Sequence, residues 1–260
     1  MNRTTTDTAL SNDTGYLSPL ESYLAPTLLS DADHPRVRNL AEELTAKATT
    51  DAEKAERLVH FVAERIAAQL PGTGDETSAS RTLELGYGHE TAKATLLVAL
   101  ARAAGIPARL HFARFDKSLM REFLPGWAWG LWPDTVATGW AELYVDGRWQ
   151  PRPDAAYDAD MLHAAKRYLA ERGLSYGVGL TLEPGAGAGG WTSQLAKRFP
   201  LVSDDGIYRD AMDYVWSEAY PNTRRHSVIR WFLGPWGRNE CARRQRAIRE
   251  AGRDYEAIAA

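Results

Sequence analysis

The spacing of apolar residues predicts three helices in the first half of the chain. Apolar positions recur every three to four residues over 35–44, again after Thr50, and again over 90–104, which is the periodicity of one helix face. Thr50 and Glu53 have the spacing of a helix N-cap and the third helical position. We expect the helix that they start to continue as far as Pro71.

The third helix is followed by a pattern typical of antiparallel strands. Residues 108–115 and 138–145 alternate between apolar and polar side chains, and residues 148–152 form a third short strand. Asp146 and Gly147 stand between the last two, and this dipeptide is a strong signal for a two-residue hairpin turn. The pattern therefore predicts an antiparallel sheet.

The C-terminal part of the chain is expected to be mainly helical. Residues 159–172 have a helical pattern, residues 173–192 are rich in glycine, and the tail from about Gly206 is expected to form helices broken at Pro221 and Pro235. Helices, then an antiparallel sheet, then more helices is the order of an α+β fold. We expect a disordered N-terminus (1–15), a core (16–160) and a helical extension packed on it (161–260).

Composition excludes several classes of protein. The 260 residues carry a formal net charge of −3, with 44% hydrophobic and 25% charged residues, as in an ordinary globular protein. A charge near zero argues against nucleic acid as the main partner. Cys241 is the single cysteine, so an internal disulfide is excluded. No apolar stretch has the roughly 20 residues of a membrane helix, and we expect a cytoplasmic protein with a small-molecule substrate, as a monomer or homodimer.

Several segments together resemble the transglutaminase-like superfamily. These segments are Gly86–Leu97 with Arg102–Arg109, Gly139–Trp149, and Tyr23–Thr27 with Asp33–Val37. The resemblance covers roughly residues 20–160. It implies a papain-like fold, in which a helix N-terminus carries a nucleophilic Cys and an antiparallel sheet brings a His and an Asp.

The catalytic residues of that family are substituted in this chain. The resemblance aligns its Cys with Glu90, its His with Thr138, and its Asp with Pro153, next to Asp154. A thioester mechanism needs a thiolate and a base, and Cys241 has no counterpart in the family. The resemblance therefore implies the fold without thiol transglutaminase or cysteine-protease chemistry.

Glu90 is the leading catalytic candidate, because the resemblance places it at the cleft. A helix N-terminus lowers the pKa of a carboxyl group and an apolar pocket raises it, so general base, general acid and nucleophile all stay open. A purely structural role in the first helical turn is the alternative. His89 is the second candidate, either in the cleft or at the surface. A metal site of His89, Glu90 and His111 has no recognised ligand spacing, and neither a metal nor another cofactor is expected.

Alternation along the predicted strand 138–145 gives further candidates. If Thr138 faces the cleft and the helix, then Trp140, Glu142 and Tyr144 share that face. Glu142 would need a partner there, and a salt bridge with Arg109 is the preferred interpretation. The aromatic segment 123–140 forms either a wall for an apolar substrate or ordinary core. The candidate substrate-binding residues are Trp140, Tyr87, Trp127, Trp129, Trp132, Glu142, Asp154 and His111, and the candidate catalytic residues are Glu90, His89 and Thr138.

The preferred hypothesis is an enzyme that uses Glu90 for acid–base chemistry on a small carbonyl-containing metabolite. Cyclisation, elimination or hydration, and isomerisation suit one carboxylate without a redox cofactor. By analogy, an Ala- and Arg-rich chain of this kind suits bacterial specialised biosynthesis. Two alternatives stay open: a catalytically inactive binding or scaffold protein, and an amide hydrolase or acyltransferase in which Glu90 activates water.

Overall fold

The computed structural model describes residues 20–174, 176–177, 180–181, 201–221 and 234–259, with side chains as far as residue 250. Its helices are η1 (Glu21–Tyr23), α1 (Pro35–Thr45), α2 (Asp51–Arg65), η2 (Gly74–Glu76), α3 (Ala79–Leu85), α4 (Glu90–Ala103), η3 (Lys117–Phe123), α5 (Gly126–Trp129), η4 (Pro153–Ala156), α6 (Ala159–Glu171), α8 (Ala211–Val215) and α10 (Pro235–Ala259). Its strands are β1 (Ala67–Ala68), β2 (Tyr87–Gly88), β3 (Ala108–Asp116), β4 (Thr135–Val145), β5 (Arg148–Arg152), β6 (Tyr176–Gly177), β7 (Leu180–Thr181) and β8 (Leu201–Tyr208). The predicted α+β class is confirmed.

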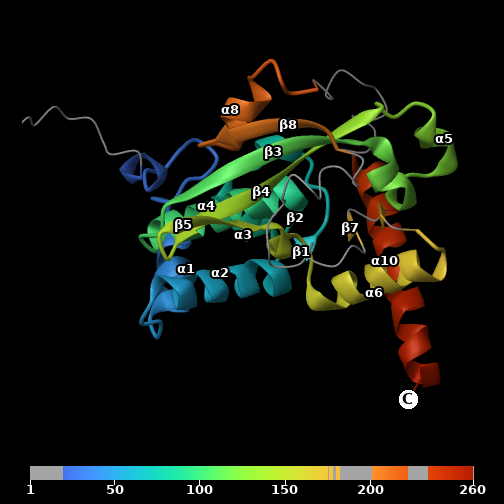
Figure 1. Ribbon diagram of the computed structural model, residues 1–260, viewed down its shortest axis with the longest axis horizontal. Helices are drawn as coiled ribbons and strands as arrows, with labels where there is room; N and C mark the ends of the chain where they lie inside the picture. The colour runs from blue at the N-terminus through green and yellow to red at the C-terminus, as the bar shows by residue number, and fades with distance from the viewer. Residues whose placement is uncertain (1–19, 175, 178–179, 182–200, 222–233, 260) are drawn as a thin grey trace, which may run out of the picture.

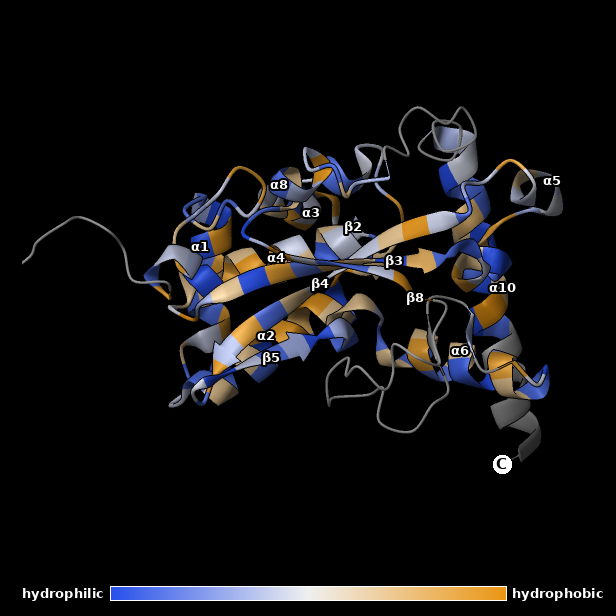
Figure 2. Cartoon of the chain, turned by 45° about the horizontal axis from the view of Figure 1, so that its top comes forward, coloured by the Kyte–Doolittle hydropathy of each residue, from blue (hydrophilic) through white to orange (hydrophobic). Residues whose placement is uncertain are grey.

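A four-stranded antiparallel sheet forms the centre of the molecule, in the order β5-β4-β3-β8 (Figure 1). Asp146 and Gly147 join β4 to β5 with positive φ angles of 52° and 76°, as a type I′ turn requires. The predicted hairpin is therefore confirmed. Figure 2 shows hydrophobic and polar bands alternating along β3 and β4, so each strand offers one apolar face and one polar face.

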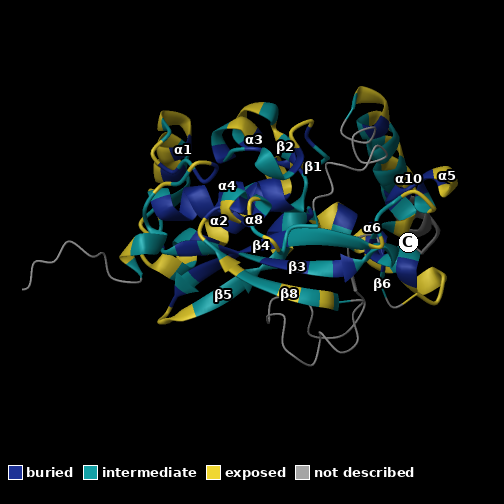
Figure 3. Ribbon diagram, turned by 90° about the horizontal axis from the view of Figure 1, so that it is seen from above, coloured by how far each residue is buried: buried dark blue, intermediate teal, exposed yellow. Residues whose placement is uncertain are grey.

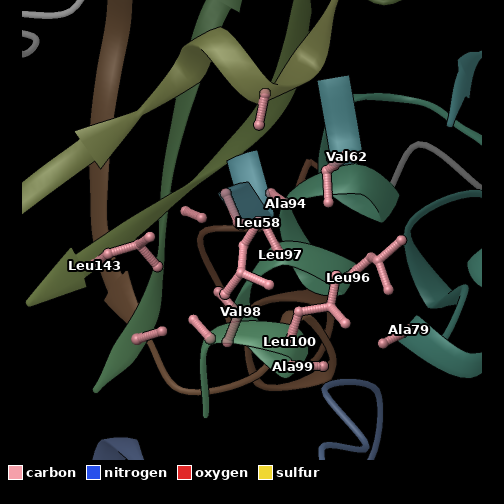
Figure 4. Packing of buried hydrophobic residues seen from close by; sticks show 14 of the residues in the cluster. Leu58, Val62, Ala79, Ala94, Leu96, Leu97, Val98, Ala99, Leu100 and Leu143 are labelled. Carbon is pink, nitrogen blue, oxygen red and sulfur yellow. The ribbon is translucent and has the colours of Figure 1, made fainter. Parts of the chain in front are cut away.

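Helix α4 packs against the apolar face of the sheet and is buried along almost its whole length (Figure 3). Its leucines meet Leu143 of β4 on one side and Leu58 and Val62 of α2 on the other (Figure 4). Helices α1 and α2 lie on the far side of α4 from the strands (Figure 1). The predicted boundaries of α4 are confirmed to within a residue. Its burial fixes the position of its N-terminus relative to the sheet.

Arg102 anchors the C-terminal end of α4. The side chain is buried, and its guanidinium group donates hydrogen bonds to the carbonyl oxygens of Ala25, Ala108 and Arg209 and to Thr27 Oγ1. Gly105 follows with φ +83°, which favours glycine. This end of the helix is thus tied to the start of β3 and to two distant parts of the chain by a charge whose donors all have oxygen partners.

Two helix boundaries in the N-terminal half differ from the sequence-based expectation. Helix α2 ends at Arg65, before Pro71, because Ile66 becomes extended and leads into β1, which pairs in parallel with β2. Residues 71–80, for which no helix was predicted, contain η2 and the start of α3, for which Ser78 is the N-cap.

The C-terminal region adds a strand where only helices were expected. β8 pairs with β3 and forms an edge of the sheet, and Gly206 lies inside it. Its acidic residues are held by bases of β3: Arg114 pairs with Asp205, and His111 with Asp204. These pairs explain how a segment with two aspartates becomes part of the sheet.

Helices α6 and α10 pack together at one end of the molecule, where Figure 1 shows them crossing. The helix expected over 159–172 is confirmed as α6. Pro235 is the first residue of α10, a position where proline is well tolerated. No helix among the described residues is long and apolar enough to cross a membrane. The expected disorder of 1–15 lies outside the described residues, as does most of the glycine-rich segment 173–192.

Candidate functional site

Glu90 is the first residue of α4 and is placed there by the short segment before it. Gly86 ends α3 with φ +69°, and Tyr87 and Gly88 form β2 against β1. A Cβ on Gly88 would lie 3.0 Å from the Cβ of Ala92, so the close approach of this strand to α4 requires glycine there. The segment therefore leads the chain directly from a buried strand into the helix that begins with Glu90.

The carboxylate of Glu90 accepts a hydrogen bond from Tyr157. The phenolic oxygen lies 2.6 Å from Glu90 Oε1. Tyr157 follows η4, and its side chain is buried in a cluster with Phe123 and Met161. Burial, together with the charge of Glu90 and the hydrogen bond to it, raises the pKa of Tyr157 well above its usual value. Tyr157 therefore remains a protonated donor to a partly exposed carboxylate.

Lys93 lies one turn further along α4 and is completely buried. Its ammonium group donates to the carbonyl oxygens of Ile66, at 2.8 Å, and Ala63, at 3.3 Å, near the C-terminal end of α2. Burial lowers its pKa to about 8, against the opposing charges of Asp158 and Glu90. Lys93 thus places a positive charge beneath the site while its hydrogen bonds hold α2 to α4.

His89 pairs with a second carboxylate, that of Asp75. Its Nε2 lies 2.8 Å from Asp75 Oδ1, and the Tyr220 hydroxyl donates to Asp75 Oδ2 at 2.8 Å. Burial alone would raise the pKa of Asp75, but the hydrogen bond and charge of His89, with bonds from Tyr220 and Thr91, hold it below its usual value. Burial alone would lower the pKa of His89, but Asp75, with the charge of Glu90, raises it. The N-terminus of α4 therefore carries two side-chain pairs.

Cys241 of α10 lies close enough to Glu90 for the carboxylate charge to act on its thiol. It packs against a cluster built on Leu124 and Ala128, to which Trp129 and Trp132 also belong. Burial, with the nearby acidic groups, raises the pKa of Cys241 to about 12, so the group is a thiol and not a nucleophilic thiolate. Two of the candidate tryptophans thus share an apolar cluster with a neighbour of Glu90.

The structure reverses the expected orientation of β4. Ala141, Leu143 and Val145 are the residues that pack with α4. Thr138 and Trp140 are therefore on the opposite face, with Glu142 and Tyr144. The expectation put Thr138 on the helix side because the family's His aligns there. Aliphatic packing against α4 decides the face instead.

His111, Trp140 and Glu142 form a polar cluster on that opposite face. His111 stacks on Trp140 with ring centroids 4.4 Å apart. Glu142 accepts from Arg109 at 2.7 Å and from His111 Nδ1 at 2.9 Å, so the expected Arg109–Glu142 salt bridge is present. The other ring nitrogen of His111 lies 2.7 Å from Asp204. The sheet thus separates this cluster from the α4 face, and the structure does not bring it together with Glu90.

The remaining candidates are dispersed. Tyr87 lies on β2, three residues before Glu90, and is partly buried. Asp154 is exposed and pairs with Arg152, which also binds Glu56. Trp127 is exposed on α5. No group of three or more His, Cys, Asp or Glu side chains in the described part of the chain is arranged to hold a metal ion.

Comparison with known families agrees with this architecture. Residues 38–152 match the model of the transglutaminase-like superfamily. The matched segment is therefore similar to that superfamily. It extends from α1 to β5 and includes α4, so Glu90 and His89 belong to it, whereas Tyr157, Tyr220 and Cys241 come from the chain beyond it.

Two solved structures are similar to the chain. One is titled a "putative cysteine protease" from Cytophaga hutchinsonii, with 20% identity and a TM-score of 0.46, covering 76% of this chain and 50% of that one. The other is titled a "putative protease" from Parabacteroides distasonis, with 22% identity and a TM-score of 0.35, covering 48% of this chain and 25% of that one. The chain thus spans half the length of the first and a quarter of the second. No curated protein matches the sequence.

Four residues of the site were not singled out from the sequence: Tyr157, Asp75, Tyr220 and Lys93. Tyr157 and Asp75 reach the N-terminus of α4 from 67 and 14 residues away, and no local spacing indicates either contact. Lys93 had a readable signal, because it and Arg102 are the two cations among the apolar residues of a helix predicted to be buried. The segment that matches the family model thus offers a helix N-terminus where a carboxylate, a phenol and a histidine–carboxylate pair gather.

Proposed function

We propose that the protein is a cofactor-independent acid–base enzyme acting on a small carbonyl-containing metabolite, with Glu90 as its central group. One observation carries the proposal: the 2.6 Å hydrogen bond from the Tyr157 hydroxyl to Glu90 Oε1 at the first residue of α4. A carboxylate and a phenol in direct contact form an acid–base pair, in which the carboxylate can accept a proton and the phenol can donate one.

Glu90 and Tyr157 would have different roles, one as proton acceptor and the other as hydrogen-bond donor. Glu90 lies at a helix N-terminus, which favours the ionised carboxylate, and its other oxygen, Oε2, would accept a proton from carbon or from water. Tyr157 fixes the carboxylate, and because its pKa is raised it keeps its proton at neutral pH. When the substrate proton reaches Glu90, the phenol can turn its hydrogen bond toward a substrate oxygen.

This chemistry suits cyclisation, elimination or hydration, and isomerisation, which need protons moved but no electrons. The apolar cluster around Cys241, Trp129 and Trp132 would form one wall of the substrate site. The raised pKa of Cys241 argues against thiol catalysis from this residue. The protein would act as a monomer or homodimer, without a nucleic-acid or membrane partner.

Untargeted metabolite mass spectrometry tests the proposal. The gene is deleted from its host and replaced by the wild-type gene, by Glu90→Gln, or by Glu84→Gln, which alters an exposed glutamate of α3. We expect the wild-type and Glu84→Gln alleles to restore one metabolite and remove its precursor. Glu90→Gln should do neither, although it melts at a similar temperature. The mass difference between the two metabolites then names the reaction: none for isomerisation, and one water for elimination or hydration.

Two results would contradict the proposal. If Glu90→Gln restores the profile as fully as the wild type, Glu90 is dispensable and the chain is a scaffold or binding protein. If the precursor that accumulates is an amide or ester and the product its acid, the reaction is hydrolysis, with Glu90 activating water.

A further inference from the structure

The Asp75–His89 pair resembles the proton-handling half of a general acid–base site, and the proposed function has not used it. Asp75 accepts from His89 through one oxygen and from Tyr220 through the other. A carboxylate accepts hydrogen bonds and does not donate them, so Nε2 of His89 must carry the hydrogen. The ring is thereby fixed in orientation and tautomer, as a carboxylate fixes a catalytic histidine.

The second ring nitrogen of His89 stands out. Nδ1 is shielded from solvent and has no hydrogen-bond partner among the residues that the structure describes. His89 is the N-cap of α4, yet its side chain caps none of the helix amides. A buried polar atom without a partner is costly, so it calls for a specific explanation such as a ligand or a catalytic role.

The charges around His89 favour the imidazolium form. The groups that face it are Asp75 from η2, Tyr220 from the C-terminal region, and Glu90 next to it in the chain. Two of these are carboxylates, and Tyr220 is a neutral hydroxyl that donates to Asp75. In the imidazolium, Nδ1 is a donor, and the complementary ligand atom is an oxygen acceptor.

We propose that His89 is the acid of the site whose base is Glu90, and that the substrate is a carbonyl compound with an acidic C–H next to the carbonyl. This inference rests on the proposed function. His89 and Glu90 are adjacent in the chain, and the charge of Glu90 acts on the imidazole. A substrate over the N-terminus of α4 that accepts a proton from Nδ1 would therefore also lie near the Glu90 carboxylate. Asp75 is a positioning residue, because it acts through His89.

The proton balance can be written in full. Glu90 takes the proton from carbon, and the electron pair of that C–H bond becomes a C=C bond. The carbonyl oxygen receives the proton from Nδ1, which leaves an enol, a neutral His89 and a protonated Glu90. In a substrate with a β,γ C=C bond the enol is a conjugated dienol. Return of the carboxyl proton to its γ carbon, and of the enol proton to Nδ1, shifts the C=C bond into conjugation with the carbonyl and restores both groups. The net reaction is an isomerisation, which needs no oxidant, reductant or second substrate.

The first test reads the imidazole directly, without a substrate. Proton–nitrogen NMR of the histidine side chains follows wild type, Asp75→Asn and His60→Gln, which removes an exposed histidine of α2 and assigns its signal. We expect His89 to stay doubly protonated above pH 6.5, the ordinary pKa of histidine, and Asp75→Asn to lower that pH. A His89 ring that loses its second proton at or below pH 6.5, or at the same pH in Asp75→Asn, would overturn the dyad.

The second test separates the two proposals in the deletion strain. His89→Gln should slow product formation by about a hundredfold or more, the usual contribution of a positioned acid, while His60→Gln restores the wild-type profile. If Glu90→Gln fails to restore the profile and His89→Gln restores it fully, the acid role of His89 is wrong and that of Glu90 stands. If both alleles restore it, the proposed function itself has failed. A melting temperature close to that of the wild type shows that His89→Gln is folded.

Discussion

Two histidines of this protein are held by carboxylates, and the two clusters differ in how completely the rings are bonded. On the polar face of the sheet, His111 has a carboxylate on each ring nitrogen, Glu142 on one and Asp204 on the other. At the N-terminus of α4, His89 has Asp75 on one nitrogen, and the other is buried without a described partner. The contrast separates a complete structural network from one that leaves a donor for a ligand.

The cluster around His111 is also balanced in charge and covered by aromatic rings. Two basic side chains, Arg109 and His111, pair with two acidic ones, Glu142 and Asp204. Trp140 stacks on His111, and the Arg109 guanidinium lies 3.9 Å from the ring centre of Trp149. Such a network joins β3, β4 and β8. We therefore expect its loss to affect stability, whereas changes at Glu90 and its neighbours should affect function more than stability.

The largest expected effect concerns Lys93, which lies one turn beyond Glu90 in α4 and donates to two carbonyl oxygens of the α2 end. Its pKa is about 8 in the folded chain against 10.5 when unfolded. Between these values the unfolded chain binds more protons, so stability rises with pH; below pH 8 the cost of burying the charge is present in full. Relative to Lys93→Met, the wild type should gain about 3 kcal/mol of unfolding free energy from pH 8 to 10.5, at about 1.4 kcal/mol per pH unit.

Urea denaturation across this pH range measures the difference. Lys54→Met, at a partly exposed lysine paired with Asp51 on α2, is the matched control and should follow the wild type at every pH. If the difference in unfolding free energy between wild type and Lys93→Met is the same at every pH, burial does not lower the pKa of Lys93.

The next effect tests the polar face of the sheet. Glu142 is 6% exposed and serves both Arg109 and His111, so Glu142→Gln leaves two cations without their shared carboxylate. We expect a loss of about 2 kcal/mol in unfolding free energy at pH 7, since breaking a buried ion pair from one side is costly. Asp204→Asn, at the exposed end of the same network, should cost at most about 1 kcal/mol. Equal losses of unfolding free energy for the two variants would contradict the expectation that the buried carboxylate contributes more than the exposed one.

Features set by residues close together in the sequence were predicted well, and features set by contacts between distant residues were not. The extent of α4 and the Asp146–Gly147 turn were predicted because local spacing and turn chemistry determine them. The alternation along β4 was predicted too, but its orientation was wrong. Alternation determines which side chains share a face and not which face meets the helix.

The contacts that define the candidate site depend on distant parts of the chain. Tyr157, Asp75 and Tyr220 converge on the start of α4 from separate segments, and no local pattern encodes such convergence. β8 was missed for a related reason. Asp204 and Asp205 are typical of turns, and only their partners on β3 make them compatible with a strand.

A smaller effect is expected from the protonation of His111. Its pKa is raised, because the bonds to Glu142 and Asp204 outweigh the opposing effect of burial. The bonded imidazolium therefore stabilises the fold fully below pH 6.5, the ordinary value, and this contribution is lost as the pH rises through the raised pKa. The comparison variant is His111→Phe, which keeps a ring against Trp140. The unfolding free energy of the wild type minus that of His111→Phe should fall by about 1 kcal/mol as the pH rises from 6.5 through the raised pKa.

Thermal or urea unfolding as a function of pH provides the test. His89 also has a raised pKa, but it is present in both proteins, so its contribution cancels in the difference. A pH-independent difference between wild type and His111→Phe would show that the ring is not bonded as an imidazolium.

The smallest effect is expected where the proposed chemistry is located. Tyr157→Phe removes the hydroxyl that donates to Glu90 and keeps the ring in its buried cluster. Glu90 is partly exposed and lies at a helix N-terminus, so water and the helix amides can replace the lost bond. We expect a loss of less than about 1 kcal/mol in unfolding free energy, compared with about 2 for Glu142→Gln, although each change weakens one carboxylate network. The same Tyr157→Phe allele should fail to restore the metabolite profile in the deletion strain. A loss as large as that of Glu142→Gln, with the profile restored, would make Glu90–Tyr157 a structural pair of the same kind as Glu142–His111.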